Sequence, residues 1–172
     1  MASTFQFIED NSGSAIRTLA RTGCYWKNYD SPWDVTDYGT YPVTAGNCSY
    51  RKYQAGYITG TYNQVSNGKF GHTANTLGTS IYLFTVISGG YQTPTTGYLS
   101  GMGGAVNITA PSGLAAAYQA VQFGASTSGS FSASTTGNPA YTQYFVTQVQ
   151  TETGASPGDS SSITLTFSFD ES

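Results

Sequence analysis

Apolar and polar residues alternate without a break near the end of the chain. The apolar members of this alternation are Ile163, Leu165, Phe167 and Phe169, and the residues between them are Thr164, Thr166 and Ser168. In a β-strand, successive side chains point to opposite faces, so a period of two gathers all apolar side chains on one face. The segment therefore predicts a strand with one buried face and one face that meets solvent or a partner.

Further strands are predicted by short runs of aromatic and β-branched residues that end at turn-forming residues. Residues 4–8 form an opening strand that ends at the turn sequence of residues 10–13. Residues 55–64 contain two glycines, which indicate a bulge or a close approach of another backbone. The nearly continuous apolar run 81–87 is typical of a strand covered on both faces, and residues 141–151 carry apolar side chains on both faces.

Two hairpins are expected from the sequences between these strands. Asn67-Gly68, within residues 66–68, is the residue pair most typical of a tight hairpin turn, so a turn is predicted there. At the end of the chain, only the loop around residues 154–159 separates strands 141–151 and 163–169. We expect these two strands to pair as an antiparallel C-terminal hairpin.

Helical patterns are nearly absent. The segment Gly113–Phe123 allows one short helix with Ser112 as its N-cap, but flanking glycines favour an extended chain equally well. The Ser/Thr/Gly-rich stretch 126–137 reads as a loop, and no linker divides the chain. We therefore predict an all-β, single-domain protein (1–172), an antiparallel β-sandwich or barrel with a C-terminal hairpin and at most one short helix.

Charged residues make up only 9% of the chain, against roughly 25% in ordinary globular domains. All 6 basic residues lie at or before Lys69, so residues 70–172 contain no Lys or Arg. Phosphate neutralisation supplies most nucleic-acid affinity, and anionic lipid surfaces attract basic segments. The charge pattern thus predicts that neither nucleic acid nor a membrane is a partner.

Residues suited to catalysis or metal binding are few. His72 is the sole histidine, and no serine lies in a nucleophile-elbow motif that would favour a catalytic triad. Together with Cys24 and Cys48, His72 provides too few and too scattered ligands for zinc. The densest carboxylate group is Asp30, Asp34 and Asp37, whose spacing fits turns better than a calcium loop. We therefore predict no catalytic residue, no cofactor and no metal, and a protein that is not an enzyme.

The first ten residues lack the basic and apolar regions of a secretory signal, which predicts synthesis and assembly in the cytoplasm. In that reducing compartment, Cys24 and Cys48 are expected to be thiols, with a disulfide as the less favoured alternative.

Aromatic residues are concentrated early in the chain. Tyr25 belongs to a cluster within residues 25–41 whose other members are the candidate contact residues Trp26, Tyr29, Trp33, Tyr38 and Tyr41. About half of the aromatic rings in this half of the chain are expected to pack in the core. The others, including at least one tryptophan, are expected to be exposed, where they contact a protein partner or stack on sugar rings.

Several stretches resemble small structural proteins encoded in the virion gene clusters of tailed bacteriophages. They are residues 42–54 (PVTAGNCSYRKYQ), 60–73 (GTYNQVSNGKFGHT), and the ending around 141–144, 158–159 and 163–171. The resemblance implies a virion component, assembled in symmetric copies on the head or at the head–tail region. Its implied partners are capsid, portal or tail proteins and further copies of the chain, and it assigns no functional residue.

The expected function is therefore that of a non-enzymatic structural protein of a virion: a head decoration, head-fibre or head–tail joining protein. The low charge agrees with this, because protein interfaces are depleted in Lys, Glu and Asp and symmetric assemblies bury neutral surface repeatedly. The main alternative is a lectin-like carbohydrate-binding domain that uses exposed Trp and Tyr. A weaker one is a small β-rich toxin or pore-former.

Overall fold

The computed structural model describes residues 2–11, 14–18, 23–31, 36–72, 77–107, 118–156 and 163–172. Its strands are β1 (Ala2–Asn11), β2 (Ser14–Thr18), β3 (Lys52–Thr61), β4 (Val65–His72), β5 (Ile81–Ser88), β6 (Val106–Asn107), β7 (Gln119–Val121), β8 (Phe123–Gly124), β9 (Ser134–Thr135), β10 (Ala140–Thr142), β11 (Tyr144–Thr151) and β12 (Leu165–Glu171). A short 3-10 turn, η1 (Leu99–Gly101), completes the described elements.

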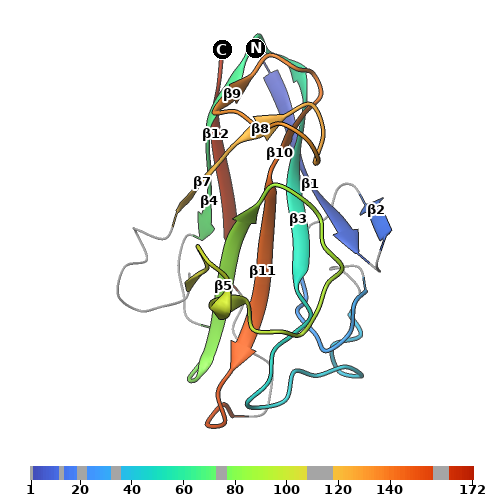
Figure 1. Ribbon diagram of the computed structural model, residues 1–172, viewed down its shortest axis with the longest axis vertical. Coiled ribbons are helices and arrows are strands. Elements are labelled where there is room, and N and C mark those ends of the chain that lie inside the picture. Colours follow the sequence, from blue (N-terminus) through green and yellow to red (C-terminus); the bar gives the residue numbers. More distant parts are fainter. Residues whose placement is uncertain are drawn as a thin grey trace.

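The strands form two antiparallel sheets (Figure 1). The larger sheet has the order β2-β1-β3-β11-β5-β6, and β10 joins it by pairing with β3 and β8. The smaller sheet has the order β12-β4-β7, with β9 paired to β4. The predicted fold class, an all-β protein with antiparallel strands in a sandwich or barrel, is confirmed.

Alternating side chains of the larger sheet pack in two directions. On its inner face, Phe145 stacks on Phe70 of the smaller sheet with ring centroids 4.3 Å apart, and Phe5 stacks on Phe167 at 4.9 Å. On its outer face, Ile8, Tyr53 and Val146 pack against Leu99. Leu99 belongs to the connection between β5 and β6, which crosses the front of the sheet in Figure 1. Both faces of the larger sheet are therefore covered at its centre, as the apolar run 81–87 predicted, but Tyr82 and Phe84 on the outer face of β5 are only partly buried.

The predicted C-terminal hairpin is wrong, although both of its strands exist. β11 lies between β3 and β5 in the larger sheet, whereas β12 pairs with β4 in the smaller one. Every residue of β11 is buried, which requires a central position with neighbours on both sides. The apolar face of β12 instead packs across the sandwich, where Phe167 and Phe169 contact Phe5. The alternation in this segment predicted its faces correctly but not its partner strand.

The turn predicted at Asn67-Gly68 is also wrong, because both residues lie inside β4. Lys69 pairs with Ser168 and Ser66 with Asp170, so Asn67 and Gly68 together oppose a single residue of β12. This is a β-bulge, and Asn67 adopts the positive φ of 54° that Asn tolerates better than most residues. The conformational preference of the pair is used for a bulge instead of a turn.

The segment for which a helix was possible is extended where the structure describes it. Residues 119–121 form β7, and Phe123 begins β8, while residues 108–117 lie outside the described part. Val121 packs with Phe70 and Phe145 in the core between the sheets, a position that requires a strand paired to β4. The stretch 126–137 is irregular except for β9, in agreement with a loop.

Candidate functional site

One row of side chains on the inner face of the larger sheet is polar. Glu9 of β1 pairs with Gln54 of β3, and Lys52 of β3 pairs with Thr147 of β11, so the four residues are neighbours on adjoining strands. All four are at most 1% exposed. Buried polar groups need hydrogen-bond partners. The row therefore requires a covering segment that supplies them.

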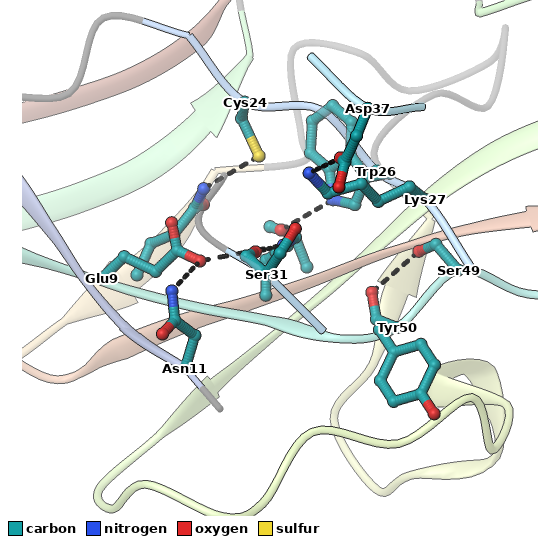
Figure 2. Close-up of polar contacts among 12 residues, drawn as sticks. Glu9, Asn11, Cys24, Trp26, Lys27, Ser31, Asp37, Ser49 and Tyr50 are labelled. Atoms are coloured by element: carbon teal, nitrogen blue, oxygen red, sulfur yellow. Dashed lines mark hydrogen bonds and ion pairs between the residues drawn. The ribbon is translucent and has the colours of Figure 1, made fainter. Parts of the chain in front are cut away.

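The covering segment is residues 23–31 (Figure 2). Gln54 Nε2 donates to Cys24 Sγ at 3.1 Å, and Trp26 Nε1 donates to Thr147 Oγ1 at 3.1 Å. Lys52 Nζ donates to the carbonyl oxygen of Ser31. Three side chains of the polar row thus attach residues 24, 26 and 31 to the sheet, and the path of this segment is fixed by buried contacts.

Two buried ion pairs lie in the same region. Lys52 Nζ is 3.8 Å from Glu9 Oε1, which also accepts a hydrogen bond from Asn11 Nδ2 at 3.2 Å. Burial lowers the pKa of Lys52, and the carboxylate of Glu9 opposes this shift. Lys27, whose side chain is fully buried, pairs with Asp37. Both lysines are therefore engaged within the fold and are not placed to bind an external anion.

Two exposed tyrosines of this segment stack on two exposed tyrosines of the stretch 36–50. Tyr25 and Tyr38 have ring centroids 5.2 Å apart with an interplanar angle of 22°, and Tyr29 and Tyr41 are 4.6 Å apart at 18°. Their exposed fractions lie between 37% and 48%. We call Tyr25, Tyr29, Tyr38 and Tyr41 the tyrosine patch. The backbone hydrogen bond from Asn28 N to Tyr41 O (2.8 Å) holds its two stretches of chain together.

No exposed charge accompanies the tyrosine patch in the described stretches 23–31 and 36–50. The charged residues there are Lys27, which is buried, and Asp30 and Asp37, which are partly buried. In Figure 1 the loops of residues 36–50 lie at the lower end of the molecule, opposite the two termini. The patch is thus a neutral, aromatic surface, and the segment 23–31 that carries two of its tyrosines is attached to the larger sheet by buried hydrogen bonds.

The structure places the predicted contact residues in different environments. Tyr29, Tyr38 and Tyr41 are exposed members of the patch, whereas Trp33 lies outside the described residues. Trp26 is partly buried against Leu83 and Val149, so it is not an exposed stacking platform. The fourth member of the patch is Tyr25, which belongs to the sequence cluster but is not one of the predicted contact residues. The sequence alone could not show that Tyr25 is part of the patch, because its stacking on Tyr38 depends on the contact between the stretches 23–31 and 36–50.

The residues considered for catalysis or metal binding do not form a described site. The side chain of His72 and all of Asp34 lie outside the described part of the structure. Among the residues that are described, no three His, Cys, Asp or Glu side chains could share a metal ion. Cys24 and Cys48 are free thiols, and burial raises the pKa of Cys24 to about 12. A thiol with so high a pKa is a poor nucleophile at neutral pH.

No protein-family model, curated protein or solved structure matches this chain. Within the described residues, no helix is long and apolar enough to cross a membrane.

Proposed function

We propose that this chain is a non-enzymatic structural component of a bacteriophage virion, a head decoration, head-fibre or head–tail joining protein. In this proposal the tyrosine patch contacts neighbouring virion proteins and further copies of the chain. The observation that carries the proposal is the exposure of two stacked tyrosine pairs on a surface with no exposed charge in the described stretches around them.

The composition of the patch supports a protein partner. The buried centres of protein interfaces are enriched in Tyr and Trp and depleted in Lys, Glu and Asp, and Tyr is a frequent hot spot. A tyrosine ring presents a large apolar face together with a hydroxyl group that can still form hydrogen bonds. Exposing the apolar faces of four such rings to water is unfavourable, and covering them with a partner lowers the free energy.

The rigidity of the patch adds to this support. Each ring is already stacked on another, and the segment beneath is attached to the sheet through Cys24, Trp26 and Ser31. Binding costs less conformational entropy when side chains are ordered in advance. A preformed surface of this kind suits an assembly in which the same contact is made many times.

The placement in a virion is supported by the resemblance of residues 42–54, 60–73 and the C-terminal stretch to phage structural proteins. It is also supported by the absence of Lys and Arg from residues 70–172, since a surface so poor in cations is unsuited to packaged nucleic acid. The lectin-like alternative loses support at Trp26, because this ring packs in the core and its Nε1–H is bonded to Thr147.

The proposal is tested by mass spectrometry of particles purified from the phage whose genome encodes the chain. Chymotrypsin is needed beside trypsin, because no trypsin site follows Lys69. We expect peptides of this chain at a constant ratio to the capsid protein through successive density-gradient fractions. Peptides confined to the lysate and absent from intact particles would contradict a structural role in the virion.

A further inference from the structure

A hollow of about 330 Å³ lies on the outer face of the larger sheet, apart from the tyrosine patch. Tyr82 and Phe84 of β5 point to this face, because alternate residues of a strand share a face and Val86 of the same set packs in the outer core. Gln150 of β11 lies opposite Tyr82, and Asn107 of β6 lies opposite Phe84. Adjacent strands thus place two rings and two amides side by side on the floor.

The wall of the hollow comes from the connection that crosses the sheet. Tyr98 and Ser100, at the 3-10 turn η1, both line it. Tyr98 is 56% exposed, and its hydroxyl donates to the carbonyl oxygen of Gly46 at 3.1 Å, which fixes the ring without covering it. Glu152, one residue beyond the end of β11, completes the rim, and its backbone N–H donates to the carbonyl oxygen of Ser80 at 2.9 Å.

The polar groups are arranged for hydrogen bonding to a ligand. In the amide orientation that satisfies Ser100, Gln150 donates to Ser100 Oγ at 2.8 Å and accepts from the Ser100 backbone N–H at 2.9 Å, while its oxygen lies 3.0 Å from Gln148 Oε1. Because Ser100 Oγ accepts this bond, its own O–H remains a donor for the hollow. The Asn107 amide and the Glu152 carboxylate add donor and acceptor atoms, so the lining can engage a ligand that carries several hydroxyl groups.

The charge of the lining limits the ligand class further. Among the described residues that line the hollow, Glu152 alone is charged, and residues 70–172 contain no Lys or Arg. Arg51, the cation beside this wall, directs its Nη2 to the carbonyl oxygen of Gly97 at 3.1 Å. A sulfated, phosphorylated or carboxylated ligand would meet a like charge without a compensating cation.

We propose that this hollow binds a neutral carbohydrate. The rings of Tyr82, Phe84 and Tyr98 would contact the apolar C–H face of a sugar, while Ser100, Asn107 and Glu152 would bond its hydroxyl groups. Small-ligand sites range from roughly 300 to 1,000 Å³, so this hollow is large enough to hold one or two sugar rings. The inference does not rest on the proposed place in a virion and holds or fails independently of it.

The test uses the full chain and saturation-transfer NMR with the methyl glycosides of glucose, galactose, mannose, N-acetylglucosamine and N-acetylgalactosamine, and with lactose and maltose. N-acetylneuraminic acid serves as the anionic comparison. We expect saturation transfer to at least one neutral sugar and none to the anionic one. Tyr98→Ala should weaken the binding at least tenfold, because it removes the exposed ring, and circular dichroism checks that the variant is folded.

Two further variants make the assignment specific. Glu152→Gln keeps two hydrogen-bonding atoms, so binding of a neutral sugar should fall only severalfold. Complete loss of neutral-sugar binding in this variant would contradict the proposed hydrogen-bonding role of the side chain and overturn the proposal. Tyr118→Ala removes another exposed tyrosine, next to β7 of the smaller sheet, and should leave binding unchanged. Absence of transfer to every neutral sugar, or transfer that persists in folded Tyr98→Ala, would also overturn it.

Discussion

The ammonium of Lys52 lies 3.8 Å from the carboxylate of Glu9, and both side chains are closed off from solvent. The same ammonium donates to the carbonyl oxygen of Ser31, so the ion pair connects two strands of the larger sheet to the segment beneath the tyrosine patch. Removing two charges from water is costly, and their attraction offsets this cost only while both partners are present. The pair therefore links the stability of the sheet to the position of the patch.

Removing one partner of this pair should be strongly destabilising. We expect Lys52→Met or Glu9→Gln to lower the free energy of unfolding by about 3–5 kcal/mol for the loss of a buried partner, and the double variant to lose less than the sum of the two. Urea unfolding followed by tryptophan fluorescence measures these values. Single variants as stable as the wild type would show that the pair is not closed off from water as described.

Alkaline pH should destabilise the protein through Cys24. Burial raises the pKa of this thiol from 9.0 to about 12, so the unfolded chain loses the proton first. The stabilising contribution of the neutral thiol is present below pH 9 and is lost as the pH rises toward 12, with a slope of at most about 1.4 kcal/mol per pH unit for one proton.

The comparison of wild type with Cys24→Ala, unfolded in urea at pH 8 and pH 10.5, isolates this effect. Burial also raises the pKa of Tyr53 and Tyr62 and lowers that of Lys52, but both proteins share these groups. We expect the wild type to lose more stability than the variant between the two pH values. Equal losses would contradict the assignment to Cys24.

The bulge at Asn67 should tolerate glycine but not a β-branched residue. Its φ of 54° is accessible to Gly and Asn and unfavourable for Val, and its Nδ2 donates to Asp170 Oδ2 at 2.7 Å. We expect Asn67→Val to cost about 1–2 kcal/mol from the left-handed backbone alone, and Asn67→Gly to cost about 1 kcal/mol or less for the lost hydrogen bond. Thermal unfolding of both variants checks the order, and a Val variant as stable as the Gly variant would refute the bulge.

Gly56 should be intolerant of any side chain. A Cβ atom there would lie 2.7 Å from Phe5 Cε2 and 2.9 Å from Thr142 Cγ2. We expect Gly56→Ala to cost about 1–3 kcal/mol through overpacking. Gly39→Ala is the matched control, because a Cβ at Gly39 meets nothing within 4 Å, and its unfolding midpoint should stay near that of the wild type. A neutral Gly56→Ala would mean that Phe5 has room to move.

Local patterns predicted local structure well. The alternation over 163–169 correctly identified the buried face of β12, and the glycines in residues 55–64 indicated a close approach, which Gly56 makes to Phe5 and Gly60 makes to the backbone of Ala2. Both features depend on the period of a strand or on the absence of a side chain. Both properties are set by a few residues that are close together in the chain, so they can be predicted from the sequence alone.

Pairing between distant segments could not be predicted in this way. Whether β12 pairs with β11 or β4 depends on which partner completes the core, and Asn67-Gly68 suits a turn and a bulge equally well. The sequence predicts that at least one of Trp26 and Trp33 is exposed but does not say which, and the Trp26 ring reaches Thr147, far along the chain. The stacking of Tyr25 on Tyr38 and of Tyr29 on Tyr41 likewise depends on the contact between the stretches 23–31 and 36–50.

We expect the tyrosine patch to be the surface through which copies of this chain associate. Size-exclusion chromatography with light scattering, at increasing protein concentration, tests it on the wild type, the double variant Tyr29→Ser/Tyr41→Ser and the control Tyr118→Ser. We predict that the wild type and the control reach a multiple of the 18.1 kDa chain mass, while the double variant remains a monomer. A wild type that stays monomeric at high concentration, or a double variant that associates equally well, would contradict the account.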